Sequence, residues 1–294
     1  MDTLQNDFIR IEVNTLGAEL YSLFNLKTGE EMLWQGDPAY WKRRSPVLFP
    51  IVGSVWENKF LYNGKQYKMS QHGFARDMEF SLTEKSDSRV TYELHSSEAT
   101  KELYPADFVL KISYELIGNS VKVTWQVVNN GEQDMHFQIG AHPAFNYKGF
   151  NPDAPVQGFF SLLPVDFTYR LSTITEKGCI DDTVTSVKYD DLCIIPITKS
   201  TFNNDALILE DSQATNVTLL DACKVPYLRM TFDAPVLGLW SPARDSYAPF
   251  VCIEPWYGRC DAEDFNGDIT KREWSNSLEV NDNWYKEYEI IIHE

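Results

Sequence analysis

The sequence has 294 residues, 43% hydrophobic and 14% aromatic, so it is long and apolar enough for a sizeable core and unlike a disordered chain. Its 43 acidic and 26 basic residues give a net charge of −17, which disfavours binding to nucleic acid or to an anionic membrane. Residues 1–13 do not resemble a signal peptide and no apolar run approaches the roughly 18–20 residues that span a bilayer, so we expect a cytoplasmic protein.

The first half of the chain alternates apolar and polar residues with a period of two, as antiparallel strands do. A hairpin is predicted at residues 60–69, where Asn63-Gly64 is typical of a two-residue turn. A short helix is predicted at residues 97–104, because Ser97 is a suitable N-cap and Pro105 would end the helix. The other predicted strands are residues 89–95, 109–116, 121–127 and 285–292.

The chain contains no internal repeat, low-complexity tract or charged linker. Glycine and proline are spread along it rather than gathered at one boundary. The sequence therefore predicts an all-β, mostly antiparallel fold with few short helices, in which residues 1–294 form a single domain. The five cysteines are odd in number and include no Cys-x-x-Cys pair, which predicts reduced thiols rather than disulfides or a zinc site.

Two of the five histidines lie in unusual surroundings. His72 is followed by Gly73-Phe74-Ala75-Arg76, and His142 lies between Gly140-Ala141 and Pro143. Small and turn-forming neighbours let the backbone pass close to a ligand while the imidazole projects from the end of a strand. The alternative for either residue is a histidine that is merely hydrogen-bonded within a turn.

A carboxylate is the third candidate. Glu254 interrupts the apolar run Val251–Trp256, and glutamate is rarely buried without a partner or a function because burying its charge is costly. A solvated glutamate on an edge strand is the alternative. Trp256, and with it Trp34 or Phe250, offers a flat apolar face for a sugar ring, although core packing explains each aromatic residue equally well.

Arginines supply the last candidates. Arg44 and Arg76 are the two that we place in a site, because the planar, permanently charged guanidinium suits oxygen-rich ligands. With Lys42 or Arg43 they would also pair with a phosphate group. The alternative is that both arginines pair with neighbouring carboxylates.

Taken together, these segments resemble the aldose 1-epimerase (galactose mutarotase-like) family. The similarity is greatest to its LacX-like branch, which is related to the glucose-6-phosphate 1-epimerases. Four motifs carry the resemblance in family order, and they extend from near residue 40 to residue 256: Arg44 with residues 46–53, residues 72–76, residues 141–146 and residues 252–256.

The resemblance implies a β-supersandwich that binds a sugar on its concave face and interconverts its anomers without a metal or cofactor. It implies that His142 is the general acid and Glu254 the general base. His72 matches the histidine near the ring oxygen, and Arg44 the arginine that contacts sugar hydroxyls. Asp205 is the best match to a further site aspartate.

Substrate identity is left open by two departures from typical hexose mutarotases, Pro143-Ala144 after the acid histidine and Arg43-Arg44-Ser45 at the early arginine. The expected partner is a small sugar or sugar phosphate. Two other classes remain. A glycoside hydrolase on the same scaffold would need two carboxylates roughly 5–9.5 Å apart. A non-catalytic sugar-binding protein would keep the pocket without turnover.

Overall fold

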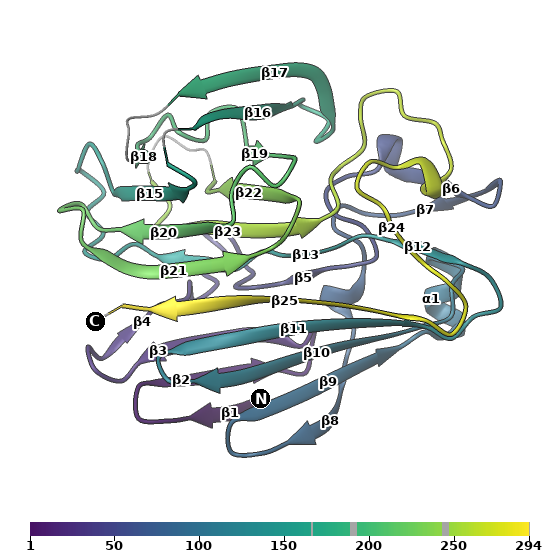
Figure 1. Ribbon diagram of the computed structural model, residues 1–294, viewed down its shortest axis with the longest axis horizontal. Helices are drawn as coiled ribbons and strands as arrows, with labels where there is room; N and C mark the ends of the chain where they lie inside the picture. The colour runs from purple at the N-terminus through teal and green to yellow at the C-terminus, as the bar shows by residue number, and fades with distance from the viewer. Residues whose placement is uncertain (166, 189–192, 243–246, 294) are drawn as a thin grey trace.

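The structure, a computed structural model, describes residues 1–165, 167–188, 193–242 and 247–293. Two large antiparallel sheets dominate it (Figure 1). The first has nine strands, in the order β18 (Ile194–Ile197), β15 (Gly158–Leu163), β20 (Asn216–Leu220), β21 (Pro226–Phe232), β25 (Asn283–Ile292), β11 (Ser120–Asn129), β10 (Phe108–Ile117), β9 (Arg89–His95) and β8 (Ser81–Lys85).

The second large sheet has eight strands and carries the candidate site. Its order is β17 (Ile180–Lys188), β16 (Thr168–Ile174), β19 (Leu207–Leu209), β22 (Val236–Trp240), β23 (Phe250–Tyr257), β13 (Ile139–Ala141) and β5 (Val47–Leu48), with β14 (Ala144–Asn146) also paired to β23. Smaller sheets are β1 (Asp2–Gln5), β2 (Ile9–Asn14), β3 (Glu19–Asn25) and β4 (Glu30–Glu31); β6 (Lys59–Tyr62) with β7 (Lys65–Lys68); and β12 (Met135–Phe137) with β24 (Asn276–Leu278).

The main core lies between the two large sheets. On β11 the alternate residues Val121, Val123, Trp125 and Val127 are at most 2% exposed, as their period-two pattern requires. The Trp125 ring lies 6.3 Å, centroid to centroid, from that of Tyr257 on β23, so side chains of the two sheets meet face to face. Figure 1 shows the long strands β25, β11, β10 and β9 side by side.

The predicted strand, hairpin and helix are confirmed where turn and capping residues determine their ends. Strand β9 spans the predicted residues, and β6 and β7 form the predicted hairpin, with positive φ at Asn63 and Gly64. Helix α1 (Glu98–Leu103) is capped by Ser97, whose hydroxyl accepts a hydrogen bond from the Thr100 N–H. Short 3₁₀ turns occur at Trp56–Asn58, Ala75–Asp77 and Ile269–Lys271.

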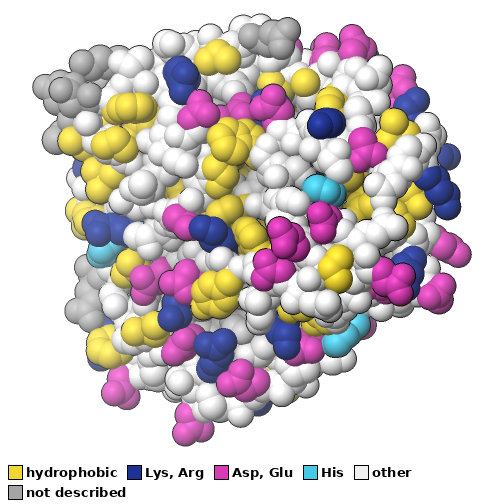
Figure 2. All heavy atoms as spheres, turned by 45° about the vertical axis from the view of Figure 1, so that its right-hand side comes forward, with side chains coloured by type: hydrophobic (Ala, Val, Ile, Leu, Met, Phe, Trp, Pro, Cys, Tyr) yellow, Lys and Arg dark blue, Asp and Glu magenta, His cyan; other side chains and the backbone are white. Residues whose placement is uncertain are grey.

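The chain surface mixes charges of both signs. On the face shown in Figure 2, acidic side chains are interspersed with lysines and arginines rather than separated from them. No helix in the described part of the chain is long and apolar enough to cross a bilayer.

Candidate active site

The predicted histidines and Glu254 meet in one hollow of about 440 Å³ on the eight-stranded sheet. That volume is within the range of small-molecule sites. Its polar wall is formed by side chains from six separate segments, so only the folded chain brings them together. The lining includes Trp41, Lys42, Arg43, Gln71, His72, Arg76, His142, Asp205, Trp240, Glu254, Trp256 and Cys260.

Glu254 lies at the floor of the hollow. It belongs to β23, which is paired on both sides and buried along its whole length, and its side chain is 1% exposed. Burial raises the pKa of its carboxyl well above the ordinary value, and the negative charge of Asp205 raises it further. Glu254 is therefore an interior carboxylate in the sheet, not a solvated edge residue.

His142 faces this carboxylate from the connection between β13 and β14. Its Nε2 lies 3.2 Å from Glu254 Oε2. The imidazole stacks on the Trp41 indole at 4.7 Å and makes edge contacts with Trp240 and His72, both at 5.6 Å. Burial lowers the pKa of His142 to about 3. Two cations of the site, Arg76 and Arg43, lower it as well.

His72 is held in a single tautomer by the backbone. The Gly53 N–H donates to its Nδ1 at 3.1 Å, so the neutral ring carries its proton on Nε2 and offers a hydrogen-bond donor. The residue has a φ of 68°, and Gly73 follows with a φ of +70°. A Cβ at Gly73 would lie 2.1 Å from the Phe49 carbonyl oxygen, which explains the glycine.

Only one of the two arginines that we expected in the site lines the hollow. Arg76 lines the hollow; its guanidinium donates to the Gln71 carbonyl at 2.7 Å, and its side chain is 14% exposed. Arg44, in contrast to the prediction, is not among the lining residues. Its guanidinium lies 3.5 Å over the Tyr21 ring and donates to the Tyr21 carbonyl and to Gln35 Oε1.

Arg43 occupies the place that we expected for Arg44. It lines the hollow and donates to both carboxylate oxygens of Asp77 at 2.9 and 3.1 Å. Asp77 also lies 3.9 Å from Arg76 Nε, so one exposed carboxylate holds both guanidinium groups at the same wall. With Lys42, the hollow therefore has a cationic wall in a strongly acidic protein.

Asp205 and Trp256 also line the hollow. Asp205 precedes β19, has a φ of 68° and lines the hollow near Glu254. Trp256 is 5% exposed, and its indole N–H faces Glu254, whose pKa it lowers against the effect of burial. Gly140 and Gly238 on the flanking strands leave room for this ring, because a Cβ on either would lie 2.6 or 2.8 Å from it.

The aromatic wall differs from the prediction. Trp34 and Phe250 do not line the hollow; they stack on each other at 4.8 Å in an apolar cluster with Ala144, Ala248 and Cys252. Trp41 and Trp240 line it instead, and both contact His142. The one sequence signal for Trp41 was its position directly before Lys42-Arg43.

The buried histidines predict a pH-dependent stability. Burial lowers the pKa of His72 well below 6.5, so the unfolded chain binds a proton there that the folded protein does not. The stability that neutral His72 contributes is present above pH 6.5 and is lost as pH falls below it. His72→Asn keeps a hydrogen-bond acceptor for Gly53 without this titration.

We therefore expect the wild-type free energy of unfolding to fall more steeply than that of His72→Asn between about pH 6.5 and about pH 4.5. Urea unfolding of both proteins across this range measures it. Parallel curves would show that His72 does not titrate differently in the two states.

Comparison with known proteins agrees with this architecture. A family model described as aldose 1-epimerase matches residues 2–159. The plasmid-encoded protein LacX of Lactococcus lactis subsp. lactis is 30% identical over 98% of both chains. A galactose mutarotase related enzyme from Lactobacillus acidophilus is 29% identical, with a TM-score of 0.92 over 100% of this chain and 97% of that one. A galactose mutarotase-like protein from Lactobacillus casei ATCC 334 is 28% identical, with a TM-score of 0.93 over the whole of both chains. These similarities, together with the sheets and the hollow, show that the chain has the galactose mutarotase-like β-supersandwich fold and belongs to the aldose 1-epimerase family.

Proposed function

We propose that this protein is an isomerase that interconverts the α and β anomers of an aldose, or of an aldose phosphate, by opening and reclosing the sugar ring. The observation that carries the proposal is the approach of His142 to Glu254 across a hollow bounded by tryptophans and hydrogen-bonding groups. Family membership supports the reaction class.

Ring opening removes a proton from the anomeric hydroxyl and delivers one to the ring oxygen. In this assignment Glu254 takes the first proton and His142 supplies the second, and the two exchange roles when the ring closes on the other face. Burial raises the pKa of Glu254 and lowers that of His142, so both shifts favour the proton on the carboxyl. The assigned roles require the proton to move to His142, which leaves Glu254 as the carboxylate base. In the same assignment His72 Nε2–H donates a hydrogen bond to a sugar oxygen, and the hydrogen bond from the Gly53 N–H to Nδ1 supports this role.

A panel of aldoses and aldose phosphates tests the proposal. Polarimetry or NMR exchange spectroscopy should show accelerated anomer exchange for at least one member, and sugar binding is measured alongside. Binding without exchange would instead favour a sugar-binding protein. Release of free sugar from a glycoside would favour a hydrolase that uses Glu254 and Asp205.

The cationic wall bears on the choice between free and phosphorylated sugars. Lys42, Arg43 and Arg76 meet there, and a phosphate dianion pairs well with arginine. If the substrate is phosphorylated, Arg76→Ala should lower kcat/KM for the sugar phosphate by at least about tenfold, since charged hydrogen bonds contribute about 1.5–3 kcal/mol. The free sugar should be affected much less. An equal loss for both would refute the phosphate assignment, and Arg170→Ala, a distant exposed arginine, is the control.

We also propose that residues 1–294 act as one aldose 1-epimerase-like domain. The largest core cluster contains Leu4 from β1 and Ile292 from β25, so its packing links the first strand to the last. Unfolding by urea should accordingly show one transition, by both fluorescence and circular dichroism.

A further inference from the structure

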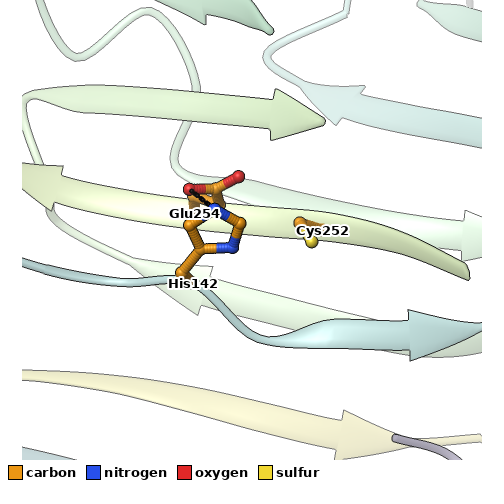
Figure 3. A group of neighbouring side chains, drawn as sticks. All are labelled: His142, Cys252 and Glu254. Atoms are coloured by element: carbon orange, nitrogen blue, oxygen red, sulfur yellow. Dashed lines mark ion pairs between the residues drawn. The ribbon is translucent and has the colours of Figure 1, made fainter. Parts of the chain in front are cut away.

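A third side chain lies beside the proposed acid–base pair. Cys252 precedes Glu254 by two residues on β23, so the two side chains are on the same face of the strand. One ligand atom each of His142, Cys252 and Glu254 lie within 4.8 Å of one another (Figure 3). In Figure 3 the ring nitrogen of His142 that does not face Glu254 lies on the side of Cys252.

These side chains have unused bonding capacity. His142 Nδ1 is buried and has no hydrogen-bond partner among the described residues, and the 3.2 Å contact of the buried Glu254 Oε2 with His142 Nε2 lacks hydrogen-bond geometry. The side chains are 9% and 1% exposed, and Cys252 is fully buried as a free thiol. A buried polar atom without a partner is costly, so a ligand that satisfies both atoms would stabilise this arrangement.

We propose that His142, Cys252 and Glu254 form a binding site for a thiophilic divalent cation, with Zn²⁺ as the preferred ion. Imidazole nitrogen, thiolate sulfur and carboxylate oxygen are the three protein ligand types of zinc, whereas Mg²⁺ and Ca²⁺ prefer oxygen alone. Bond lengths of about 2.0–2.3 Å place tetrahedral ligand atoms about 3.5 Å apart, so shifts of about 1 Å bring the three atoms into range.

The bound ion would coordinate His142 and Glu254, the two side chains that transfer protons in the proposed reaction. A carboxylate that ligates zinc cannot accept the anomeric proton, so Zn²⁺ is an inhibitor that competes with the sugar. This consequence rests on the proposed function, whereas metal binding itself does not. The two are tested separately below.

Cobalt spectroscopy tests the site directly, because Co²⁺ substitutes for Zn²⁺ in such sites and its thiolate complexes absorb in the near ultraviolet. We expect one Co²⁺ per chain with a thiolate charge-transfer band that Zn²⁺ abolishes. Cys252→Ser should remove the band and raise the Kd for Zn²⁺ at least about tenfold in calorimetry. Cys260→Ser changes a buried thiol that lines the hollow but is not one of the three proposed ligands; it is the matched control and should retain both.

Absence of the band in the wild-type protein, or its survival in Cys252→Ser, would overturn the proposal. Weak binding of several ions without the band would indicate nonspecific binding to surface carboxylates, and this result would also overturn the proposal. In a separate experiment, Zn²⁺ should raise the apparent KM for the sugar. The increase, measured against the metal-free KM of the same variant, should be smaller in Cys252→Ser than in Cys260→Ser. If the band is present but no variant or wild-type sample exchanges anomers, the metal site stands and the proposed function fails.

Discussion

Glu254→Gln should lower kcat for anomer exchange by about 10²–10⁴-fold while the protein remains folded. Glutamine has the shape of the glutamate side chain but cannot accept the anomeric proton. The buried site already favours an uncharged side chain, because burial raises the pKa of Glu254, so the neutral amide should not destabilise the fold. His142→Ala should cause a loss of similar size, since the imidazole delivers the proton to the ring oxygen. Exchange spectroscopy at saturating sugar gives kcat, and circular dichroism confirms folding.

The double variant distinguishes a working pair from two independent contributors. Groups that act on one proton transfer are strongly non-additive, so His142→Ala with Glu254→Gln should lose little more than either single change. Glu115→Gln, whose carboxylate lies near Arg89 and Lys122 away from the hollow, is the control and should keep the wild-type rate. Full activity in either single variant would reject the assigned roles.

The fold was predictable where the signal is local. Alternation over residues 121–127 placed one face of β11 in the core, because a strand must present every second side chain to the same side. The Asn63-Gly64 turn and the Ser97 cap located the ends of their elements through backbone geometry. The strand order of the large sheets was not predictable, since β11 pairs with β25 across more than half of the chain.

Several residues that line the hollow were predictable from the sequence, but not all of them. Glu254 and His142 were recognisable from unusual residues in apolar or turn-forming surroundings. The choice between Arg43 and Arg44 was not, because neighbouring side chains diverge and only tertiary contacts decide which one reaches the hollow. Arg44 is held outside by Tyr21 and Gln35, which lie on segments whose proximity the sequence does not reveal. The same reason explains why Trp41, not Trp34, contacts His142.

A buried ion pair supports one wall of the hollow. Arg272 Nε donates to Asp261 Oδ1 at 2.5 Å, and the two side chains are 1% and 2% exposed. Asp261 also accepts a hydrogen bond from the Trp56 N–H at 2.9 Å, which ties the segment after β23 to residues 53–56. That segment carries Cys260, packed so closely on Gly53 that a Cβ there would lie 2.4 Å from the Cys260 Cβ. Gly53 in turn fixes the tautomer of the site histidine.

Arg272→Ala should therefore lower the free energy of unfolding by about 3–5 kcal/mol, because it leaves the Asp261 carboxylate buried without its cation. The double variant Arg272→Met with Asp261→Asn should lose less than the single change, since it removes both charges and keeps an acceptor for the Trp56 N–H. Arg170→Ala breaks an ion pair whose side chains are 55% and 58% exposed, so it should cost no more than about 1 kcal/mol. Urea unfolding of the three variants gives the comparison. If Arg272→Ala were no more destabilising than Arg170→Ala, desolvation of the pair would not be what holds this wall in place.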